Sequence, residues 1–418
     1  MRVYKFGGAS VRNAEGVRNL HKIISDEREL FIIVSAMGKT TNALEAVFAA
    51  LQSGSRDESK EHIATLRAYH AEIIDDLYHA PTTLESVESI FAELEAVAYN
   101  TVYKSEEAEL WYDTIVAFGE MLSTTIISEY LNSVGSRNCW VDMRRAFLTE
   151  QRHKDATIDI EASTPLLRAM VQQSDCSLFV GQGFIGAAPD GTTTTLGREG
   201  SDYSAAVVAN ILDAESMSVW KDVDGILNAD PKVFPDAKQI KELNYLDTIE
   251  LAYSGAQIIH PKTIKPLQNK NIPLYVRPFG DKRKPGTVIR GTSAPVRVPI
   301  IILKKDQVLL TIRSRDFSFA LEERFAHVFS LLERLRIKTN LIHNSAVNLS
   351  LSVDNSWHID ELKGLLHADG FDVLMSRDME LLTIRSYTEE LLRKYGFTPN
   401  VYIRQTTQST VRIVRKKK

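Results

Sequence analysis

Short apolar segments alternate with helical patterns through much of the chain, and this alternation constrains the fold most. "VYKF" runs into Gly7-Gly8, "NAEGVRNLHKIISDE" has helical periodicity, and "LFIIVSA" is an apolar strand that ends at Gly38. The same rhythm returns later with "CWVDM", "CSLFVGQGF", "SMSVWKDV" and "IPLYVRPF". Apolar strands separated by helices tend to pair in parallel and to be covered on both faces. The pattern therefore predicts an α/β domain with a mainly parallel central sheet.

Two regions depart from this rhythm. Residues 57–135 are almost continuously helical in pattern, and we interpret them as covering helices that are largely an insertion. After a linker-like stretch at 290–299, "LLTIRS" at 309–314 recurs at 381–386, which indicates a repeated βαββαβ module. The second copy lacks its closing helix and strand, and we expect the preceding "PIIILK" to complete it. The sequence thus predicts a catalytic domain at 1–292 and an α+β region at 293–418 with a shortened second unit.

Composition narrows the classes of partner. The 418 residues carry a formal net charge of −4, which argues against nucleic acid as the main partner. No apolar run has the length of a membrane span, and the N-terminus has no apolar signal core, so we predict a cytoplasmic protein without a membrane segment. Cys139 and Cys176 lie far apart without metal-ligand spacing. We interpret them as small buried residues in a reducing compartment, and we predict no protein metal site.

"SAMGKTTN" resembles the end of a nucleotide-binding loop. A phosphate-binding loop of that class needs a further glycine at position 33, but Ile33 stands there, inside the strand. What remains is a strand that opens onto a helix N-terminus, which suits anionic groups. Ser35, Lys39 and Thr41 are therefore candidates for binding a carboxylate as readily as a phosphate.

Three further stretches carry polar groups suited to anions. In "YKFGGAS", Lys5 ends a strand, the glycines allow close backbone approach, and Ser10 is placed to cap the next helix. In "LGREGSDYSAA", Arg198 has the planar fork that clamps a carboxylate, and Asp202 opens a helix of small residues. "WKDVDGILNADPKVFPDA" follows an apolar strand, and the ends of strands in open α/β sheets are where ligands bind.

Five stretches occur together, in this order and at similar spacing, in aspartate kinases, which this chain resembles over essentially its whole length. They are "KFGGAS", "SAMGKTTN", "GREGSDYSAA", "WKDVDGILNADPKV" and "SGAQIIHPKTIKPLQNKNIPLYVR". The resemblance implies a three-layer α/β/α amino-acid kinase domain, followed by tandem ACT-like modules of ferredoxin-like α+β fold. It also implies ATP-dependent, Mg²⁺-assisted phosphorylation of the L-aspartate side chain to 4-phospho-L-aspartate, the first step of lysine, threonine and methionine biosynthesis.

The resemblance assigns roles residue by residue. Lys5 is implied to neutralise the transferring phosphoryl group, and Asp202 to orient the network around the phosphates. Glu120 is implied to meet the ammonium group of aspartate and Arg198 its α-carboxylate. The implied aspartate-binding set is Ser35, Thr41, Glu120, Arg198 and Ser201, and the implied ATP-binding set is Lys5, Gly7, Gly8, Ser10, Lys221, Asp222, Asn228, Asp230, Lys232 and Gln257.

Four positions differ from the commonest pattern of the family. Ala9 stands where threonine is usual, Glu199 where a third glycine is frequent, Lys221 where threonine is common, and Gln257 where lysine is common. Lys221 is placed to offset the charge lost at Gln257. None of the four removes a core chemical group, so we expect them to affect nucleotide affinity rather than activity.

Two alternatives stay open from the residues alone. One is another amino-acid kinase that acts on glutamate, N-acetylglutamate or UMP, and the other is a catalytically silent amino-acid sensor. The resemblance to ACT modules implies that an amino-acid effector would bind where the first strand of a module meets its first helix. That corner reads "RSRDFSFALEERF" in the first unit and "RSYTEELLRKYG" in the second, and neither has a glycine at the corner to let the backbone approach a ligand. We therefore expect these modules mainly to build a homodimer, with weak or absent feedback inhibition.

Overall fold

The computed structural model describes residues 1–256, 259–292, 298–315 and 322–417, and the chain divides into two compact units. Unit 1 comprises Met1–Ile226, Gln239–Ile249 and Ile258–Ser293, and unit 2 comprises Leu227–Lys238, Glu250–Gln257 and Ala294–Lys418. The predicted domain boundary between residues 292 and 293 coincides with the start of residues 293–297, which the structure does not describe. Two segments that we expected in the first domain, 227–238 and 250–257, group with unit 2.

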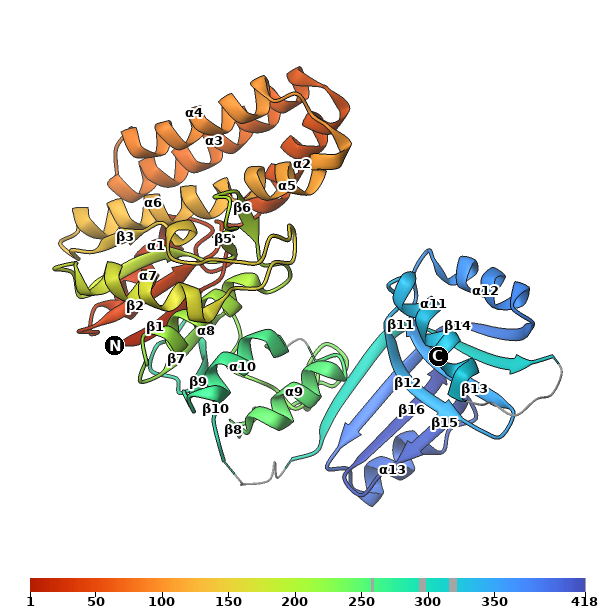
Figure 1. The fold of residues 1–418 in the computed structure, drawn as a ribbon. Coiled ribbons are helices and arrows are strands. Elements are labelled where there is room, and N and C mark those ends of the chain that lie inside the picture. Colours follow the sequence, from red (N-terminus) through yellow and green to blue (C-terminus); the bar gives the residue numbers. More distant parts are fainter. Residues whose placement is uncertain (257–258, 293–297, 316–321, 418) are drawn as a thin grey trace. The chain divides into compact units, whose positions relative to one another are not determined.

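Unit 1 is built on an eight-stranded sheet with the order β3-β4-β2-β1-β7-β9-β10-β8 (Figure 1). Neighbouring strands from β3 to β9 are parallel, and only the β9–β10 pair is antiparallel. This confirms the predicted mainly parallel α/β fold. The strands are β1 (Arg2–Phe6), β2 (Leu30–Val34), β3 (Cys139–Val141), β4 (Leu178–Gln182), β7 (Met217–Lys221), β8 (Glu242–Leu243), β9 (Leu274–Pro278) and β10 (Thr287–Ile289), with a hairpin of β5 (Ile185–Ala187) and β6 (Thr193–Thr195).

Helices cover both faces of this sheet. Tyr4 and Phe6 of β1 belong to a buried apolar cluster with α1 (Ala14–Ile24) and α6 (Phe118–Ser133), whereas α8 (Gly200–Ile211) packs against β1, β2 and β7. Side chains alternate along a strand, so Val3 and Lys5 face the side opposite to Tyr4 and Phe6. The remaining helices of this unit include α2 (Thr40–Ser53), α3 (Arg56–Tyr78), α4 (Glu85–Asn100), α5 (Ala108–Val116), α7 (Ile160–Gln172) and α10 (Pro261–Asn269), and α9 (Tyr245–Tyr253) joins the two units in sequence.

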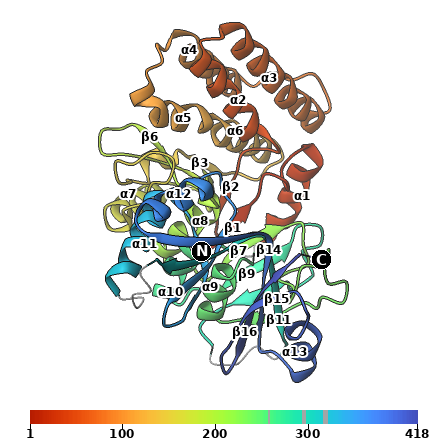
Figure 2. The ribbon, with the colours of Figure 1, turned by 90° about the vertical axis from the view of Figure 1, so that its right-hand side faces the viewer.

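The stretch 57–135 contains α3, α4, α5 and α6. Figures 1 and 2 both show α3 and α4 side by side, with α5 and α6 between them and the sheet. Their apolar positions bury Ile63, Leu66, Phe91 and Leu94 in the cluster that also holds Phe6. The helical layer is therefore part of the same core as the sheet rather than a separate body.

Unit 2 contains a six-stranded antiparallel sheet with the order β12-β13-β11-β14-β16-β15. The segment "PIIILK" and the first "LLTIRS" are joined in one long strand, β11, whose residues 300–304 pair with 381–385 of β14. The early segment thus completes the second module, as predicted. The elements are β11 (Ile300–Ser314), α11 (Glu322–Arg334), β12 (Thr339–Asn344), β13 (Asn348–Asp354), α12 (Ile359–Ala368), β14 (Phe371–Arg385), α13 (Glu389–Gly396), β15 (Val401–Thr406) and β16 (Thr410–Lys416).

The prediction for the two cysteines is wrong. Cys139 and Cys176 form a disulfide, with their Cα atoms 5.9 Å apart, and both residues are only half-buried. Cys139 starts β3 and Cys176 lies just before β4, and these strands are neighbours in the sheet. Sheet pairing brings together two residues that the sequence separates by 37 positions.

Within the described ranges, none of the helices combines the length and the apolar character needed to cross a bilayer.

Candidate functional site

The carboxyl ends of β1 and β2 lie side by side, and their loops are locked together. Gly38 N donates to Gly8 O at 3.0 Å, and Ser35 N donates to Phe6 O at 3.2 Å. A Cβ on Gly8 would lie 2.3 Å from the carbonyl oxygen of Ala36, so only glycine fits there. Gly8 is therefore required for contact between the two loops, whereas at Gly7 the nearest atom to an added Cβ is Lys5 Nζ at 3.7 Å.

Lys5, Asp202 and Lys221 form a charged group on the α8 face of the sheet. Lys5 Nζ lies 2.8 Å from Asp202 Oδ1, and Lys221 Nζ lies 3.6 Å from Asp202 Oδ2. The register explains this convergence, because Lys5 of β1 pairs with Val219 of β7. Lys221 lies two residues further along β7, so its side chain points to the same face of the sheet as Lys5. The Asp202 side chain is fully buried. Burial opposes its charged form, but the two ammonium groups outweigh burial and hold the Asp202 pKa below its ordinary value.

Glu120, in the first turn of α6, lies beside the loop after β2. Its Oε1 accepts from Ala36 N at 3.1 Å, and Ser123 of the same helix donates to Ser35 O at 2.7 Å. Glu120 is 3% exposed, and its Oε2 has no hydrogen-bond partner within the described part of the chain. Burial raises the pKa of Glu120 to about 8, although the positive charge of Lys5 acts in the opposite direction. A buried carboxylate oxygen without a partner is suited to receive a cation.

Arg198 lies in a strained turn between β6 and α8. Gly197 has φ +72° and Glu199 has φ +57°, so two of three consecutive residues are left-handed. Left-handed backbone favours glycine, yet position 199 is Glu199, which is exposed and whose side chain also interacts with Asp202. Arg198 is exposed, and among the described residues its guanidinium takes part in no ion pair.

Ser201 and Thr41 occupy the first turns of α8 and α2. Ser201 is 8% exposed, and a Cβ on Gly183 would lie 2.5 Å from its hydroxyl oxygen, so β4 and α8 approach closely at this point. Thr41 is half-buried and follows Thr40, the first residue of α2. Both hydroxyls therefore lie at helix N-termini, where backbone N–H groups favour an anion.

Helix α3 contacts both loops. The Tyr69 hydroxyl donates to Arg12 O at 2.5 Å, and His70 Nε2 lies 3.4 Å from the Thr40 hydroxyl. Burial lowers the pKa of His70 to about 4, so its imidazole is neutral and donates from Nδ1 to Leu66 O. The sequence did not point to Tyr69 or His70, because each fits an ordinary amphipathic helix.

Ser10 does not cap α1, contrary to our prediction. The helix begins at Ala14 and is capped by Asn13, whose side chain accepts from Gly16 N at 3.0 Å. Ser10 instead belongs to the turn after β1, and its hydroxyl donates to Trp220 O at 3.5 Å. Ser10 and Asp222 both line a cleft of about 710 Å³ between the β1–α1 loop and the ends of β7 and β9.

The other residues of the predicted ATP-binding set belong to unit 2 or lie outside the described residues. Asn228, Asp230 and Lys232 belong to unit 2, where the Asn228 side chain donates to Pro299 O at 2.7 Å and accepts from Lys238 N at 2.6 Å. Asp230 accepts from Lys232 N at 2.9 Å in a local turn. Gln257 and the core of the effector corner, residues 316–321, lie outside the described residues. His260 caps α10 by accepting from Lys262 N, which is a structural role.

Over the described residues, no three His, Cys, Asp or Glu side chains are grouped to hold a metal ion.

Comparison with known proteins identifies the family. Residues 1–278 match the model of the amino acid kinase family. Lysine-sensitive aspartokinase 3 of Escherichia coli is 32% identical over 359 residues, which cover 85% of this chain and 78% of that protein. Chloroplastic aspartokinase 1 of Arabidopsis thaliana is also 32% identical and covers 85% of this chain, which spans only 63% of that plant protein.

Solved structures agree with this assignment. Crystal structures of E. coli aspartokinase III, one with lysine and aspartate and one with aspartate and ADP, match with a TM-score of 0.81 at 27% identity. Each alignment covers 100% of this chain and 96% of the E. coli chain, so it includes the C-terminal region. The chain belongs to the amino acid kinase family and, within that family, to the aspartokinases.

Proposed function

We propose that this aspartokinase transfers the γ-phosphoryl group of ATP to the side-chain carboxylate of L-aspartate at the carboxyl edge of the unit 1 sheet. The observation that carries the proposal is the buried Asp202 carboxylate, which the buried Lys5 and the partly exposed Lys221 share. A fixed pair of ammonium groups is suited to the negative charge of a transferring phosphoryl group. The product, 4-phospho-L-aspartate, opens the synthesis of lysine, threonine and methionine.

Aspartate binding is assigned to the groups around Glu120 and Arg198. The Oε2 atom of Glu120, which has no hydrogen-bond partner among the described residues, would pair with the substrate ammonium. The exposed Arg198, which forms no ion pair within the same part of the chain, would bind the α-carboxylate through two parallel hydrogen bonds. Ser35, Thr41 and Ser201 would supply hydroxyl contacts. These groups leave the side-chain carboxylate of the substrate as the free nucleophile.

ATP binding is assigned to the Lys5 side of the site. Lys5 would contact the γ-phosphate and Lys221 a second phosphate oxygen, while Gly7 leaves room beside the Lys5 ammonium. Ser10 and Asp222 line the neighbouring cleft, which is large enough for part of a nucleotide. Mg²⁺ would enter as the complex with ATP, held mainly by phosphate oxygens. For Asn228, Asp230, Lys232 and Gln257, nucleotide binding stays a prediction.

The chemistry requires no general base from the protein. A substrate carboxylate is already ionised at neutral pH, so it attacks the γ-phosphorus directly. Lys5 then stabilises the charge on the oxygens of the transferring group, and Asp202 holds Lys5 in place. No covalent enzyme intermediate is required.

For the whole assembly we propose a cytoplasmic homodimer formed through the C-terminal modules, with weak or absent inhibition by lysine or threonine. Support comes from the antiparallel sheet of unit 2, whose edge strand β12 leaves Ile342 and His343 exposed. Sedimentation as a monomer would contradict the dimer. Strong inhibition by sub-millimolar lysine would contradict the proposed regulation.

The function is tested by ADP release with a panel of acceptors. We expect turnover with L-aspartate and none above background with L-glutamate, N-acetyl-L-glutamate or UMP. Preference for one of the other acceptors would identify a different amino-acid kinase. Nucleotide binding without turnover on any of them would identify a silent sensor.

Arg198→Lys should raise the KM for aspartate by about tenfold, equivalent to roughly 1.4 kcal/mol, with a smaller change in kcat. A point charge replaces a planar fork, so two-point recognition of the carboxylate is lost while net charge is kept. Initial rates at varied aspartate provide the measurement, and Arg393→Lys, an exposed arginine of α13, is the control. If only the KM for ATP changed, Arg198 would belong to the nucleotide site.

The KM for aspartate should fall as the pH rises through about 8, the value to which burial raises the Glu120 pKa. Below that pH the side chain is mostly protonated and neutral, and above it the carboxylate pairs with the substrate ammonium. Glu120→Gln cannot ionise, so it should show a high KM that no longer follows pH in this range. A wild-type KM that stays constant through this range would reject this role of Glu120.

A further inference from the structure

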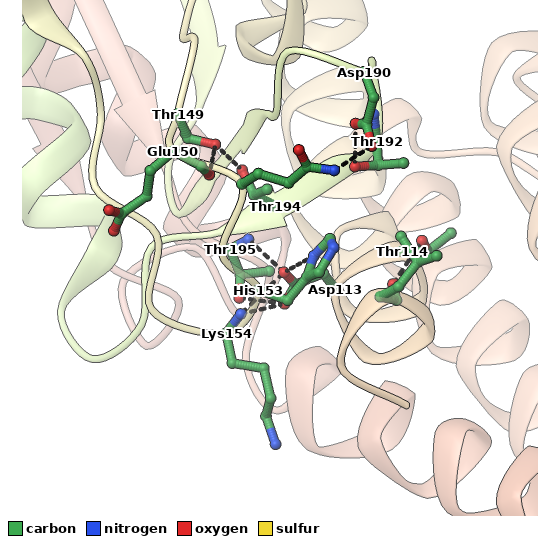
Figure 3. Close-up of polar contacts among 12 residues, drawn as sticks. Asp113, Thr114, Thr149, Glu150, His153, Lys154, Asp190, Thr192, Thr194 and Thr195 are labelled. Atoms are coloured by element: carbon green, nitrogen blue, oxygen red, sulfur yellow. Dashed lines mark hydrogen bonds and ion pairs between the residues drawn. The ribbon is translucent and has the colours of Figure 1, made fainter. Parts of the chain in front are cut away.

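Asp113, in α5, is a fully buried carboxylate that the proposed mechanism does not use. It accepts hydrogen bonds from two segments far away in the sequence. Thr195 donates to it from Oγ1 at 2.6 Å and from its backbone N at 3.0 Å, at the end of β6. His153 Nδ1 donates at 2.9 Å, and Lys154 N donates at 3.0 Å. Figure 3 shows Asp113 between these donors.

The residues that donate to Asp113 lie next to the segment that carries Arg198. Thr195 is three residues before Arg198, and its carbonyl oxygen accepts from Ala156 N at 2.9 Å, which fixes the 153–156 loop to β6. The loop then packs against Gly197, because a Cβ added there would lie 2.6 Å from Asp155 Oδ1 and 3.1 Å from Lys154 O. The backbone on the N-terminal side of Arg198 is therefore held by the residues that Asp113 anchors.

Asp113 is also connected to the helix that carries Glu120. Its carbonyl oxygen accepts from Ala117 N at 3.2 Å, where α5 passes into α6, and Glu120 lies in the first turn of α6. The side chain of Asp113 thus ties the Arg198 turn to α5, and α5 continues into the helix that carries Glu120. Under the proposed function, these two residues bind the α-carboxylate and the ammonium group of the same substrate.

We propose that Asp113 is a positioning residue that fixes the separation between Arg198 and Glu120, and with it the recognition of an α-amino acid acceptor. The inference rests on the proposed function, since it assumes that both residues bind aspartate. Displacement of a binding group by about 1 Å is enough to cost up to about 10²-fold in rate, so a loosened Arg198 turn should be measurable. Loss of Asp113 should change the KM for aspartate rather than the phosphoryl-transfer step, because Asp113 contacts neither Lys5 nor Asp202.

The test is Asp113→Asn in the full chain, assayed by ADP release. Asparagine keeps the shape, but it loses the charge and turns an NH₂ group toward donors, which leaves N–H groups of Thr195 or Lys154 unpaired. We expect the KM for aspartate to rise by about tenfold or more, with the KM for ATP unchanged. Asp75→Asn in α3, which keeps an oxygen able to accept from Thr82 N, is the control and should leave both KM values unchanged.

A milder pair of variants covers the case in which Asp113→Asn does not fold. Thr195→Val removes only the hydroxyl donor, and Thr195→Ser restores it, so the KM for aspartate should rise in the first and return in the second. The inference would be overturned if folded Asp113→Asn had a wild-type KM for aspartate. It would also be overturned if the two Thr195 variants had equal KM values for aspartate. If Arg198→Lys also had no effect, the assignment of Arg198 itself would fail, and this inference would fall with it.

Discussion

Replacing Lys5 with alanine should lower kcat by about 10²-fold or more, with little change in the KM for aspartate. Lys5 is buried, and its ammonium is fixed 2.8 Å from Asp202. A charge held in this way needs no reorganisation when negative charge grows on the transferring group, so its loss acts on the transition state rather than on substrate binding. Steady-state kinetics of the purified variant, with a thermal melt to confirm folding, give the measurement.

Lys282→Ala is the matched control for Lys5→Ala. Lys282 is also a lysine with a carboxylate partner, Asp26, at 2.7 Å, but the pair lies at the surface, where such pairs contribute little. Its kcat should stay at the wild-type value. A near wild-type kcat in Lys5→Ala would reduce Lys5 to a structural partner of Asp202.

Asp202→Asn should lower kcat by about 10²-fold or more and also reduce thermal stability, because breaking a buried ion pair typically costs about 3–5 kcal/mol. The substitution leaves the ammonium groups of Lys5 and Lys221 facing each other without the buried carboxylate. Lys5 would then no longer be held at the end of β1. Kinetics and a melting curve on the same preparation measure both effects.

A double-mutant cycle with Lys5→Ala separates the two roles of Asp202. If Asp202 acts by holding Lys5, the loss in kcat for the double variant should be far smaller than the product of the two single losses. Additive losses would mean that Asp202 acts on the nucleotide independently of Lys5. A fully active Asp202→Asn enzyme would contradict both readings.

Much of the fold could be predicted because local pattern and tertiary structure agree. The strand before Gly7 and the apolar run before Ser35 have the residues that a sheet covered on both faces requires, and both lie where they were expected. The family resemblance, which the comparisons confirm, rested on ordered motifs. It is also physically consistent, since the register of β1 and β7 brings Lys5 and Lys221 to one buried Asp202.

The wrong or missing predictions concern contacts that no local pattern encodes. The Cys139–Cys176 disulfide depends on which strands are neighbours in the sheet. The cap of α1 is Asn13 rather than the predicted Ser10. Ser10 N donates to Gly7 O in a turn that precedes the helix, so the helix begins later in the sequence than expected. Asp113 could have been noticed as a charge within the apolar stretch "WYDTIVAF", but its donors come from two distant segments.

The central claim is that the side-chain carboxylate of L-aspartate receives the phosphoryl group. Hydroxylamine converts an acyl phosphate to a hydroxamate, so the identity of the trapped product shows which carboxylate has reacted. With MgATP, L-aspartate and hydroxylamine, we predict aspartyl β-hydroxamate in equal amount to ADP, and loss of both products in Lys5→Ala. ADP release without hydroxamate, or a hydroxamate formed from L-glutamate but not from L-aspartate, would contradict the account.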